Sequence, residues 1–582
     1  MTFHRYYQDE LTYLREMGQK FSAHYPKLAP FLAIDSADPD VERLLEGFAF
    51  LTAKLRQKVD DEVPEFTSGL LSSIWPNFMR PVPGMSILAF TPIANSIRGK
   101  KTIARGSEVD SKLVEGIRCR FRTCYDVDVY PILVDAVEVR SLSGKSQIEI
   151  TFKTDSGQPF SEIQLDTLRL FLHGDSRKTD SLYMNLLSHL DGIGLQCGSE
   201  ELPQSLTGLD LHPIGFEDHE SVIPSPDNVA NFYRTLQEYH CFPDKFRFFE
   251  IRGFDPLRAK LLGNKLCITL YLDRELQPDC YPVKDSFRLF CTPIVNIFER
   301  DAQPLRLHPA KTEYLIKPSA NDKQHYEVFT VEEMSGSIQG EVDRRKYRNY
   351  HDVNNVLQHI AGEDEGDYYQ LRHVPSFVGR NVDIYASFVH AGKGYVRKAD
   401  RPEVISVKLS CTNGNLNRHL YIGDIDQHSA STPEYVNFEN ITTVTQSYPA
   451  PIHLGVDWAL IGAMSVKFRS ITKLESFKQL VSLFDYPSYY SKQAHRIHQR
   501  RLEGIHAIKV SKVTRIKSQL PVRGMQVCFD VDSEKFTSEG EMYFFFTVVN
   551  HLLNATAQLN TFVETMVADR ATGESHIWPW KH

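Results

Sequence analysis

Cysteine is scarce in this sequence: nine residues among 582, and no C-x-x-C pair occurs. An odd and thinly spread set supports neither a disulfide framework nor a zinc ribbon. We therefore expect free thiols and a chain that belongs in a reducing compartment.

Long apolar runs are also missing. The most apolar stretch, residues 543–549, is followed by Asn550, His551 and Asn554. No segment reaches the roughly 20 apolar residues that a membrane span needs, and the N-terminal segment has no apolar core of a secretory signal. We expect a cytoplasmic chain without direct membrane insertion.

Positive charge is not in excess, because 66 basic residues stand against 74 acidic ones and give a net charge of −8. Proteins that coat nucleic acid are normally basic, so this balance disfavours that class. The shares of hydrophobic residues (42%) and charged residues (24%) are close to the globular average and exclude a wholly disordered chain. A chain of this length predicts about three to five domains.

The common nucleotide-binding motifs are incomplete. Gly144–Ser146 resembles the end of a phosphate loop, but Val139 stands where that loop needs a glycine, so we expect a hairpin turn. Gly192, Gly194 and Gly198 nearly match a dinucleotide fingerprint. Their last spacing is one residue too long and a helix-like segment precedes them, so we expect a helix end followed by a turn.

Candidate metal ligands and catalytic carboxylates are present only as isolated pairs. His495 and His498 could share a helix face, but no nearby cysteine or carboxylate set completes a metal site, so we expect exposed histidines. Three aspartate pairs have a spacing of two, which places both carboxylates on one face of a strand and leaves general acid–base chemistry open. These are Asp126 with Asp128, Asp424 with Asp426, and Asp530 with Asp532. We predict no catalytic, cofactor-binding or metal-binding residue, and no cofactor.

The hydrophobic periodicity changes along the chain. Steps of three and four predict a helix over 3–21, and Asp38-Pro39 begins a second one that we expect to end at Glu62, with a short helical turn over 65–74. Short alternating segments after Pro81 predict strands, and a stripe from Met542 to Met566 predicts a long helix. The fold class is α+β: long N-terminal helices, several β-rich domains, and a mixed C-terminal domain with a long helix. The predicted domains are a helical segment (1–82), a β-rich domain (83–225), a second α+β domain (226–395) and a C-terminal α+β domain (396–582).

The N-terminal helices carry wide apolar stripes ahead of a β-rich body. Helices this long need a partner surface to be stable in water. Two readings stay open: the stripes pack on the chain's own body, or they form a bundle with other chains. The candidate interface residues are Tyr7, Leu11, Leu14, Phe21, Leu44, Leu45, Phe48, Leu51 and Leu55.

The most basic region, Lys492–Lys517, holds eight basic residues against one acid, Glu503. It could face water, an acidic protein surface, or nucleic acid. The candidate contact residues are Arg496, Arg500, Arg501, Lys509, Lys512, Arg515 and Lys517.

The N-terminal block also resembles a known family over about 85 residues. The matching features, in order, are Asp38-Pro39, Val41–Leu44, Asp60–Glu62 and Arg80-Pro81. On these features the chain is identified as a member of the TssF family, also called ImpG or VasA, whose members are baseplate subunits of the bacterial type VI secretion system. Later segments look similar too: 291–298, 326–329, 409–413 and the tail from 540 to 579.

The resemblance implies a structural role without catalysis. Family members are similar to the dimeric wedge protein of contractile phage baseplates: a second TssF copy and one TssG would join the chain, with helices of all three in a core bundle. The wedge would also carry TssK and TssE, and wedges would surround the VgrG spike as a platform for tube and sheath. We expect a cytoplasmic baseplate docked at the inner membrane complex and no nucleic-acid partner. The alternatives are a hydrolase-type enzyme and a nucleic-acid-binding protein that uses residues 492–517.

Overall fold

The computed structural model confirms a mixed α+β fold, built from two compact units, Met1–Ile74 and Trp75–His582. The structure describes residues 3–24, 39–142, 144–198, 200–202, 208–225, 232–308, 310–320, 325–338, 344–350, 367–376, 381–390, 394–395, 403–454, 456–464, 471–517, 520–557 and 561–579.

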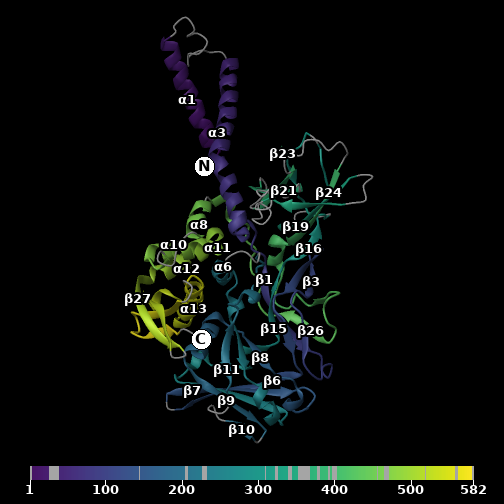
Figure 1. The fold of residues 1–582 in the computed structure, drawn as a ribbon, viewed down its shortest axis with the longest axis vertical. Coiled ribbons are helices and arrows are strands. Elements are labelled where there is room, and N and C mark those ends of the chain that lie inside the picture. The colour runs from purple at the N-terminus through teal and green to yellow at the C-terminus, as the bar shows by residue number, and fades with distance from the viewer. Residues whose placement is uncertain are drawn as a thin grey trace. The chain divides into compact units, whose positions relative to one another are not determined.

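The first unit is a helical hairpin. Helices α1 (Phe3–His24) and α3 (Pro39–Ile74) pack against each other and run in opposite directions (Figure 1). The 36 residues of α3 make it about 54 Å long at 1.5 Å per residue. The expected helix end at Glu62 is wrong, because one helix continues through Pro64 to Ile74. Pro64 removes a single backbone donor, and the hydrogen-bonded turns on both sides outweigh that loss.

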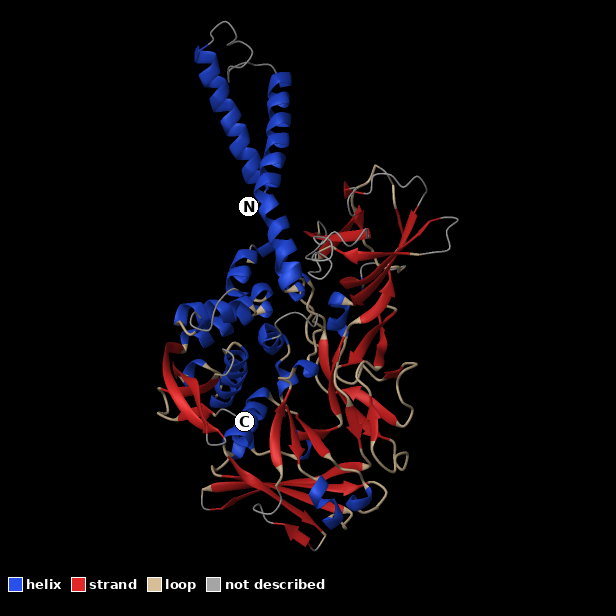
Figure 2. Ribbon diagram, in the orientation of Figure 1, coloured by secondary structure: helices blue, strands red, loops and turns tan. Residues whose placement is uncertain are grey.

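The described residues of the second unit form six sheets, and most of the helices of this unit gather beside the C-terminal sheet that contains β27 (Figure 2). The six-stranded sheet has the order β25-β3-β4-β15-β1-β26. Its strands are β1 (Met85–Pro92), β3 (Glu108–Val114), β4 (Ile117–Thr123), β15 (Cys291–Val295), β25 (Gln427–His428) and β26 (Val436–Asn440). The predicted domain boundaries at 225/226 and 395/396 therefore fall between strands of one sheet, and the division into four domains stays a prediction.

Two antiparallel sheets of medium size and a small one stand beside it. The five-stranded sheet has the order β10-β9-β13-β7-β6, the four-stranded sheet β11-β12-β8-β14, and the two-stranded sheet β2-β5. The strands are β2 (Lys101–Ile103), β5 (Val127–Val129), β6 (Ile132–Leu142), β7 (Lys145–Thr154), β8 (Thr167–Leu172), β9 (Leu190–Cys197), β10 (Glu200–Leu202), β11 (Asp210–Ile214), β12 (Phe248–Arg252), β13 (Lys265–Leu272) and β14 (Phe287–Leu289).

The largest sheet has nine strands. Its main path is β16-β24-β19-β20-β21-β22-β18, with β17 beside β24 and β23 beside β22. The strands are β16 (Phe298–Asp301), β17 (Leu305–Arg306), β18 (Tyr314–Leu315), β19 (Glu327–Ile338), β20 (Arg345–Asn349), β21 (Asp367–Pro375), β22 (Val382–His390), β23 (Gly394–Tyr395) and β24 (Glu403–Thr412). Its own buried cluster centres on Met334, Ala386 and Leu409, which have no exposed surface.

The C-terminal sheet, β27-β28-β29-β30, packs with helices. Helix α13 contacts α4, α6 and β29, and Phe544 of α13 stacks edge-on against Tyr183 of α4 and Tyr239 of α6. The strands are β27 (Ile505–Lys517), β28 (Leu520–Val531), β29 (Phe562–Asp569) and β30 (Ser575–Trp578). The helices of this unit are α4 (Ser176–Ser188), α6 (Phe232–Cys241), α8 (Asp457–Met464), α10 (Leu474–Leu483), α11 (Tyr486–Tyr490), α12 (Lys492–Glu503) and α13 (Glu539–Ala555).

The glycine motifs are structural. Gly144 has a φ of 80° in the turn between paired strands β6 and β7, so the predicted hairpin is confirmed. The expected helix end at the second motif is wrong, because Gly192 and Gly194 lie inside strand β9. A Cβ at Gly194 would lie 2.9 Å from Cε2 of Tyr271 on the neighbouring strand. Glycine is needed there because the aromatic ring lies against the backbone.

The long C-terminal helix ends earlier than its stripe predicts. Helix α13 stops at Ala555, with Thr556 as its C-cap, while Val563 and Met566 lie on β29, which pairs in parallel with β28. Residues 562–567 are mostly buried, and a strand buries both of its faces when it lies inside a covered sheet. The apolar residues of this strand happen to continue the helical spacing.

The nine cysteines are all free thiols, so the expectation of no disulfide framework is confirmed. Among the residues that the structure describes, no helix is both long enough and apolar enough to cross a membrane.

Candidate assembly surfaces and a buried histidine cluster

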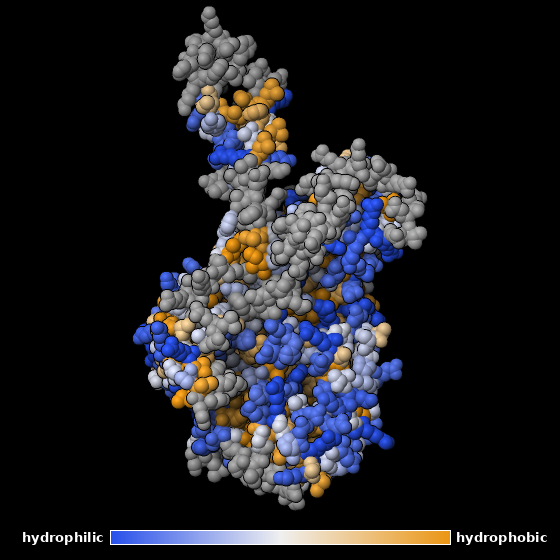
Figure 3. All heavy atoms as spheres, viewed as in Figure 1, coloured by the Kyte–Doolittle hydropathy of each residue, from blue (hydrophilic) through white to orange (hydrophobic). Residues whose placement is uncertain are grey.

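One face of helix α3 is apolar and open. Leu44, Phe48, Leu51 and Leu55 are 74, 59, 60 and 64% exposed. Their spacing of four, three and four residues places them in one row along the helix. We call these four residues the outer face; apolar atoms are visible along the described part of the helical unit in Figure 3.

The opposite side of helix α3 faces α1 inside the helical hairpin. Ala49 and Ala53 of α3 have no exposed surface, and Leu45 is half-buried. Arg56 Nη1 of α3 donates a hydrogen bond of 2.7 Å to Glu10 Oε1 of α1. Small alanines allow two helices to approach closely, so this side holds the hairpin together and leaves the outer face uncovered.

The predicted interface residues therefore divide into two groups. Tyr7, Leu11 and Leu14 of α1 are half-buried, as Leu45 is, whereas the outer face is exposed. The side chain of Phe21 lies outside the described residues. Full burial of a Leu or Phe side chain stabilises by about 1.5–3 kcal/mol. At these exposures more than half of that stabilisation is still available to a partner at each outer-face residue.

The basic region is less exposed than its composition suggests. Arg501 is 15% exposed, forms an ion pair with Glu541 and lies over the ring of Tyr239. Arg515 forms a two-point ion pair with Glu564, with distances of 2.9 and 2.8 Å. Arg501 therefore stabilises the interior of the second unit and does not belong to an open contact surface.

The remaining basic residues are accessible. Arg500 Nη2 donates to the backbone carbonyl of Glu534 at 2.9 Å, and Arg496, Lys509 and Lys512 are exposed. The side chain of Lys517 lies outside the described residues. Lys509 and Lys512 lie on β27, the edge strand of its sheet.

The β27–β28 hairpin is exposed on both faces toward the end of β27 and the start of β28. Val510, Ile516 and Leu520 are 44, 77 and 68% exposed. A two-stranded ribbon is only marginally stable in water without a further layer. Apolar and basic side chains are thus exposed on both faces of this hairpin.

The aspartate pairs hold local structure. Asp126 Oδ1 accepts from the backbone N–H of Arg105 at 2.7 Å, and Asp128 Oδ1 accepts from the Thr102 hydroxyl at 2.6 Å. The cavity beside these two aspartates has a volume of about 30 Å³. That volume is about right for a water molecule and too small for an organic substrate.

The other two pairs contact basic side chains or cap a short helix. Asp424 and Asp426 lie 3.3 and 3.7 Å from Lys112 Nζ. Asp530 forms a two-point ion pair with Arg570, and Asp532 caps a short 3-10 helix by accepting from the N–H of Glu534. Each pair therefore has a structural explanation.

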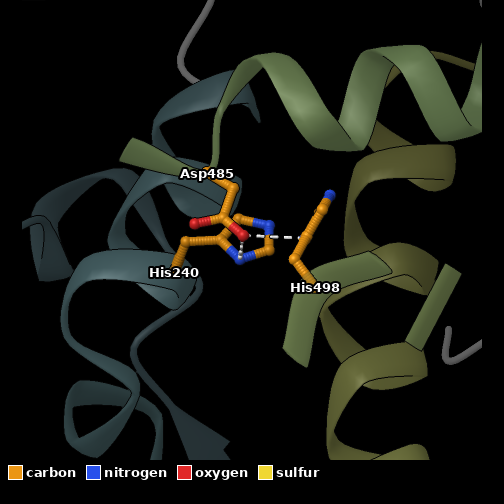
Figure 4. Close-up of side chains that lie close together, drawn as sticks. All are labelled: His240, Asp485 and His498. Carbon is orange, nitrogen blue, oxygen red and sulfur yellow. Dashed lines mark ion pairs between the residues drawn. The ribbon is translucent and has the colours of Figure 1, made fainter. Parts of the chain in front are cut away.

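A cluster of titratable side chains lies where none is expected. His495 is exposed as predicted, but the expectation for His498 is wrong, since its side chain is 3% exposed. His498 Nδ1 lies 2.7 Å from Asp485 Oδ2, and His240 Nδ1 lies 3.7 Å from the same oxygen (Figure 4). His498 is buried because it shares a face of α12 with buried Leu502.

The charges in this cluster follow from its burial. Burial lowers the pKa of His240 to about 3, so this imidazole is neutral near pH 7. Burial raises the pKa of Asp485, but the two histidines and the Ser488 N–H outweigh it and hold that pKa below its usual range. Asp485 is therefore an ionised, buried carboxylate between two imidazoles.

Solved structures share this fold. The chain matches a structure of the type VI secretion system TssK-TssF-TssG baseplate subcomplex with a TM-score of 0.78 and 24% identity, covering 93% of this chain and 99% of that one. It also matches the baseplate complex from the type VI secretion system with a TM-score of 0.61 and 22% identity, over 100% of this chain and 99% of that one. The fold is thus of a class found in chains of large secretion assemblies.

A family model and a curated relative give the identification. The type VI secretion system TssF model matches residues 1–582, so the chain belongs to the TssF family. It is 24% identical to the type VI secretion system component TssF1 of Pseudomonas aeruginosa, over 99% of this chain and 98% of that protein. The resemblance found in the N-terminal block is therefore confirmed over the whole chain.

Proposed function

We propose that this chain is a structural wedge subunit of a type VI secretion baseplate, and that it joins the wedge through the outer face of α3. The observation that carries this proposal is the row of Leu44, Phe48, Leu51 and Leu55, each at least 59% exposed. Four large apolar side chains in one row on a helix are the pattern of a helix-in-bundle contact. The role needs no catalysis.

The occupant of the outer face is a helix of a TssG-type subunit. A solved structure with this fold is a TssK-TssF-TssG subcomplex, which supports TssG and TssK as partners here. A second copy of this chain would add its own helical hairpin to the same bundle. TssE, the VgrG spike and the tube and sheath are more distant partners of the same wedge, which we place in a cytoplasmic baseplate docked at the inner membrane complex.

A second contact is the basic surface of Arg496, Lys509 and Lys512, together with the exposed apolar residues of the β27–β28 hairpin. We propose an acidic protein surface as its partner. Exposed charge pairs contribute only about 0–1 kcal/mol each, so the apolar residues Val510, Ile516 and Leu520 would supply most of the affinity. A partner with an acidic rim and an apolar centre fits this surface.

We also propose that the helical unit is an assembly segment carried by an independently folded body. The second unit has buried clusters of its own, such as the one around Met334 in the nine-stranded sheet. A long N-terminal helical segment, β-rich domains and a mixed C-terminal domain with helix α13 would then be separate functional parts. Truncation before Trp75 should leave the body folded.

The direct experiment is co-expression of the full chain with the TssG-type subunit, with purification through either partner at moderate and high salt. We expect recovery of both chains, largely independent of salt, because an apolar contact is not screened. Recovery of nucleic acid with a steep loss as salt rises would instead support the nucleic-acid alternative. Hydrolytic activity that follows the chain and is lost on Asp126→Asn would support the enzyme alternative.

A further inference from the structure

The three side chains of the buried cluster come from three separate helices. His240 is in the last turn of α6, Asp485 is the N-cap of α11, and His498 is on α12. Their side chains are 3, 7 and 3% exposed. One ligand atom from each lies within 4.8 Å of the others. Figure 4 shows the carboxylate of Asp485 between the two imidazole rings.

The hydrogen bonds around His498 fix which nitrogen is free. The hydroxyl of Ser482 donates its only proton to the carbonyl of Lys478 at 2.8 Å. At 3.0 Å from this hydroxyl, His498 Nε2 must therefore be the donor of that hydrogen bond. In the neutral imidazole, Nδ1 then carries the lone pair, and it faces Asp485 Oδ2 at 2.7 Å.

Two atoms with lone pairs this close need a positive charge between them. A proton could supply it, but His498 Nδ1 is buried without a hydrogen-bond partner. Nor has the buried Nε2 of His240 a hydrogen-bond partner. A proton would bridge the Asp485 carboxylate to one imidazole only, whereas a metal ion would bind all three side chains.

We propose that His240, Asp485 and His498 hold a structural divalent metal ion, and that the ion is Zn²⁺. Two imidazoles and a carboxylate are ligands that zinc accepts, at about 2.0–2.2 Å. In a tetrahedral centre with such bonds the ligand atoms are about 3.3 Å apart. The observed separations of 2.7 and 3.7 Å lie on either side of that value.

The surroundings of the cluster are those of a metal site. Metal-bound histidines usually donate their other N–H to a neighbouring acceptor, as His498 does to Ser482. Bound carboxylates are usually hydrogen-bonded in turn, and Asp485 Oδ1 accepts from the N–H of Ser488 at 3.1 Å.

The site is structural because its three ligand side chains are almost fully buried. The ion would tie α6, which is remote in sequence, to the α11–α12 pair next to the basic surface. In this way it would hold together the helical side of the second unit.

The test uses the full chain, purified through a tag without histidine and without chelator. Elemental analysis should find about one equivalent of zinc, and Co²⁺ exchange should produce the visible absorption bands of a tetrahedral site. A strong chelator should lower the melting temperature of the wild-type chain. This melting measurement needs no substitution, so it stands even if a variant folds poorly.

Three variants locate the ion. His498→Gln and Asp485→Asn should each retain less than about 0.1 equivalent of zinc, and the chelator should no longer change their melting temperature. Asp485→Asn keeps the acceptor for the Ser488 N–H, so it tests the ligand without removing the helix cap. The matched control, His495→Gln, changes the exposed histidine of the same helix and should retain the metal.

Two results would overturn the proposal. Wild-type chain with less than about 0.1 equivalent of zinc and no Co²⁺ bands would show that the cluster is a buried imidazolium–carboxylate pair. Zinc that stays bound in both ligand variants would place the metal elsewhere in the chain.

Discussion

Replacing Phe48 and Leu51 by glutamine should separate assembly from folding. Both residues belong to the outer face and are 59 and 60% exposed, so the isolated chain loses little burial. Glutamine is a good helix former, so α3 should be retained. Burial of the remaining exposed area in a bundle would stabilise by about 1–2 kcal/mol for each residue, or about 2–4 kcal/mol together.

That free energy converts into a measurable change in affinity. At about 1.4 kcal/mol per tenfold, the dissociation constant for the TssG-type subunit should rise about 30- to 700-fold. Titration by mass photometry measures this constant, and circular dichroism with thermal melting measures the fold of the isolated variant. The matched controls are Glu46→Gln and Lys54→Gln, which change exposed polar residues of the same helix.

Two outcomes would refute the reasoning about the outer face. If the double variant binds its partner as tightly as the wild-type chain, the outer face is not the packing surface. If the isolated variant loses helix or melts at a lower temperature, Phe48 and Leu51 belong to the chain's own core.

Three further predictions concern the second unit. Lys509→Glu with Lys512→Glu should weaken one subunit contact in pull-downs and leave the melting temperature unchanged. Arg501→Glu should lower the melting temperature, because it places a second carboxylate beside Glu541 in a buried site. Equal melting temperatures for the two variants would contradict this prediction. Gly540→Ala should destabilise by about 1–3 kcal/mol in urea titrations, because its Cβ would lie 2.5 Å from the backbone of α4; an unchanged midpoint would show that the two helices can separate. Burial raises the pKa of Glu327 to about 7, so the folded chain binds more protons than the unfolded chain between about pH 4.5 and 7, and stability should fall as pH rises through that window. Glu327→Gln removes this dependence, so urea midpoints should favour the variant more at pH 8 than at pH 5, and a difference that stays constant with pH would count against the buried carboxyl.

Local patterns predicted the elements whose signals are local. Strand β4, Ile117–Thr123, is one of the short alternating segments that predict strands after Pro81, and α3 begins at Pro39, where a helix start is predicted. The helix predicted from the apolar stripe that begins at Met542 ends at Ala555, because hydrophobic spacing reports which residues are buried and not which backbone conformation they have. A strand covered on both faces can continue a helical stripe, as β29 does.

Contacts between distant segments were beyond the reach of sequence patterns. The six-stranded sheet joins β1 to β15 and β26, which lie about 200 and 350 residues further along the chain. Asp485 and His240 are just as remote from each other. One local signal for His498 was present, because it lies four residues before the apolar Leu502 on the same helix face.

The interface prediction shows the same limit. The stripe on α3 predicted an apolar packing face, but the division into an inner row with Ala49 and Ala53 and an outer row with Phe48 and Leu51 depends on where α1 lies. Likewise the run of basic residues could not reveal that Glu541 pairs with Arg501 from another helix. Composition gives the charge of a segment, and only the fold gives its partners.

Hydrogen exchange of the chain, alone and in complex with the TssG-type subunit, tests the central claim most directly. Peptides from the 43–56 region of α3 should exchange more slowly in the complex, since a helix packed on a second partner opens less often. Peptides from strand β13, which is buried in the body, provide the reference and should exchange at the same rate in both states. Unchanged exchange over 43–56 in a complex that has demonstrably formed would contradict the account.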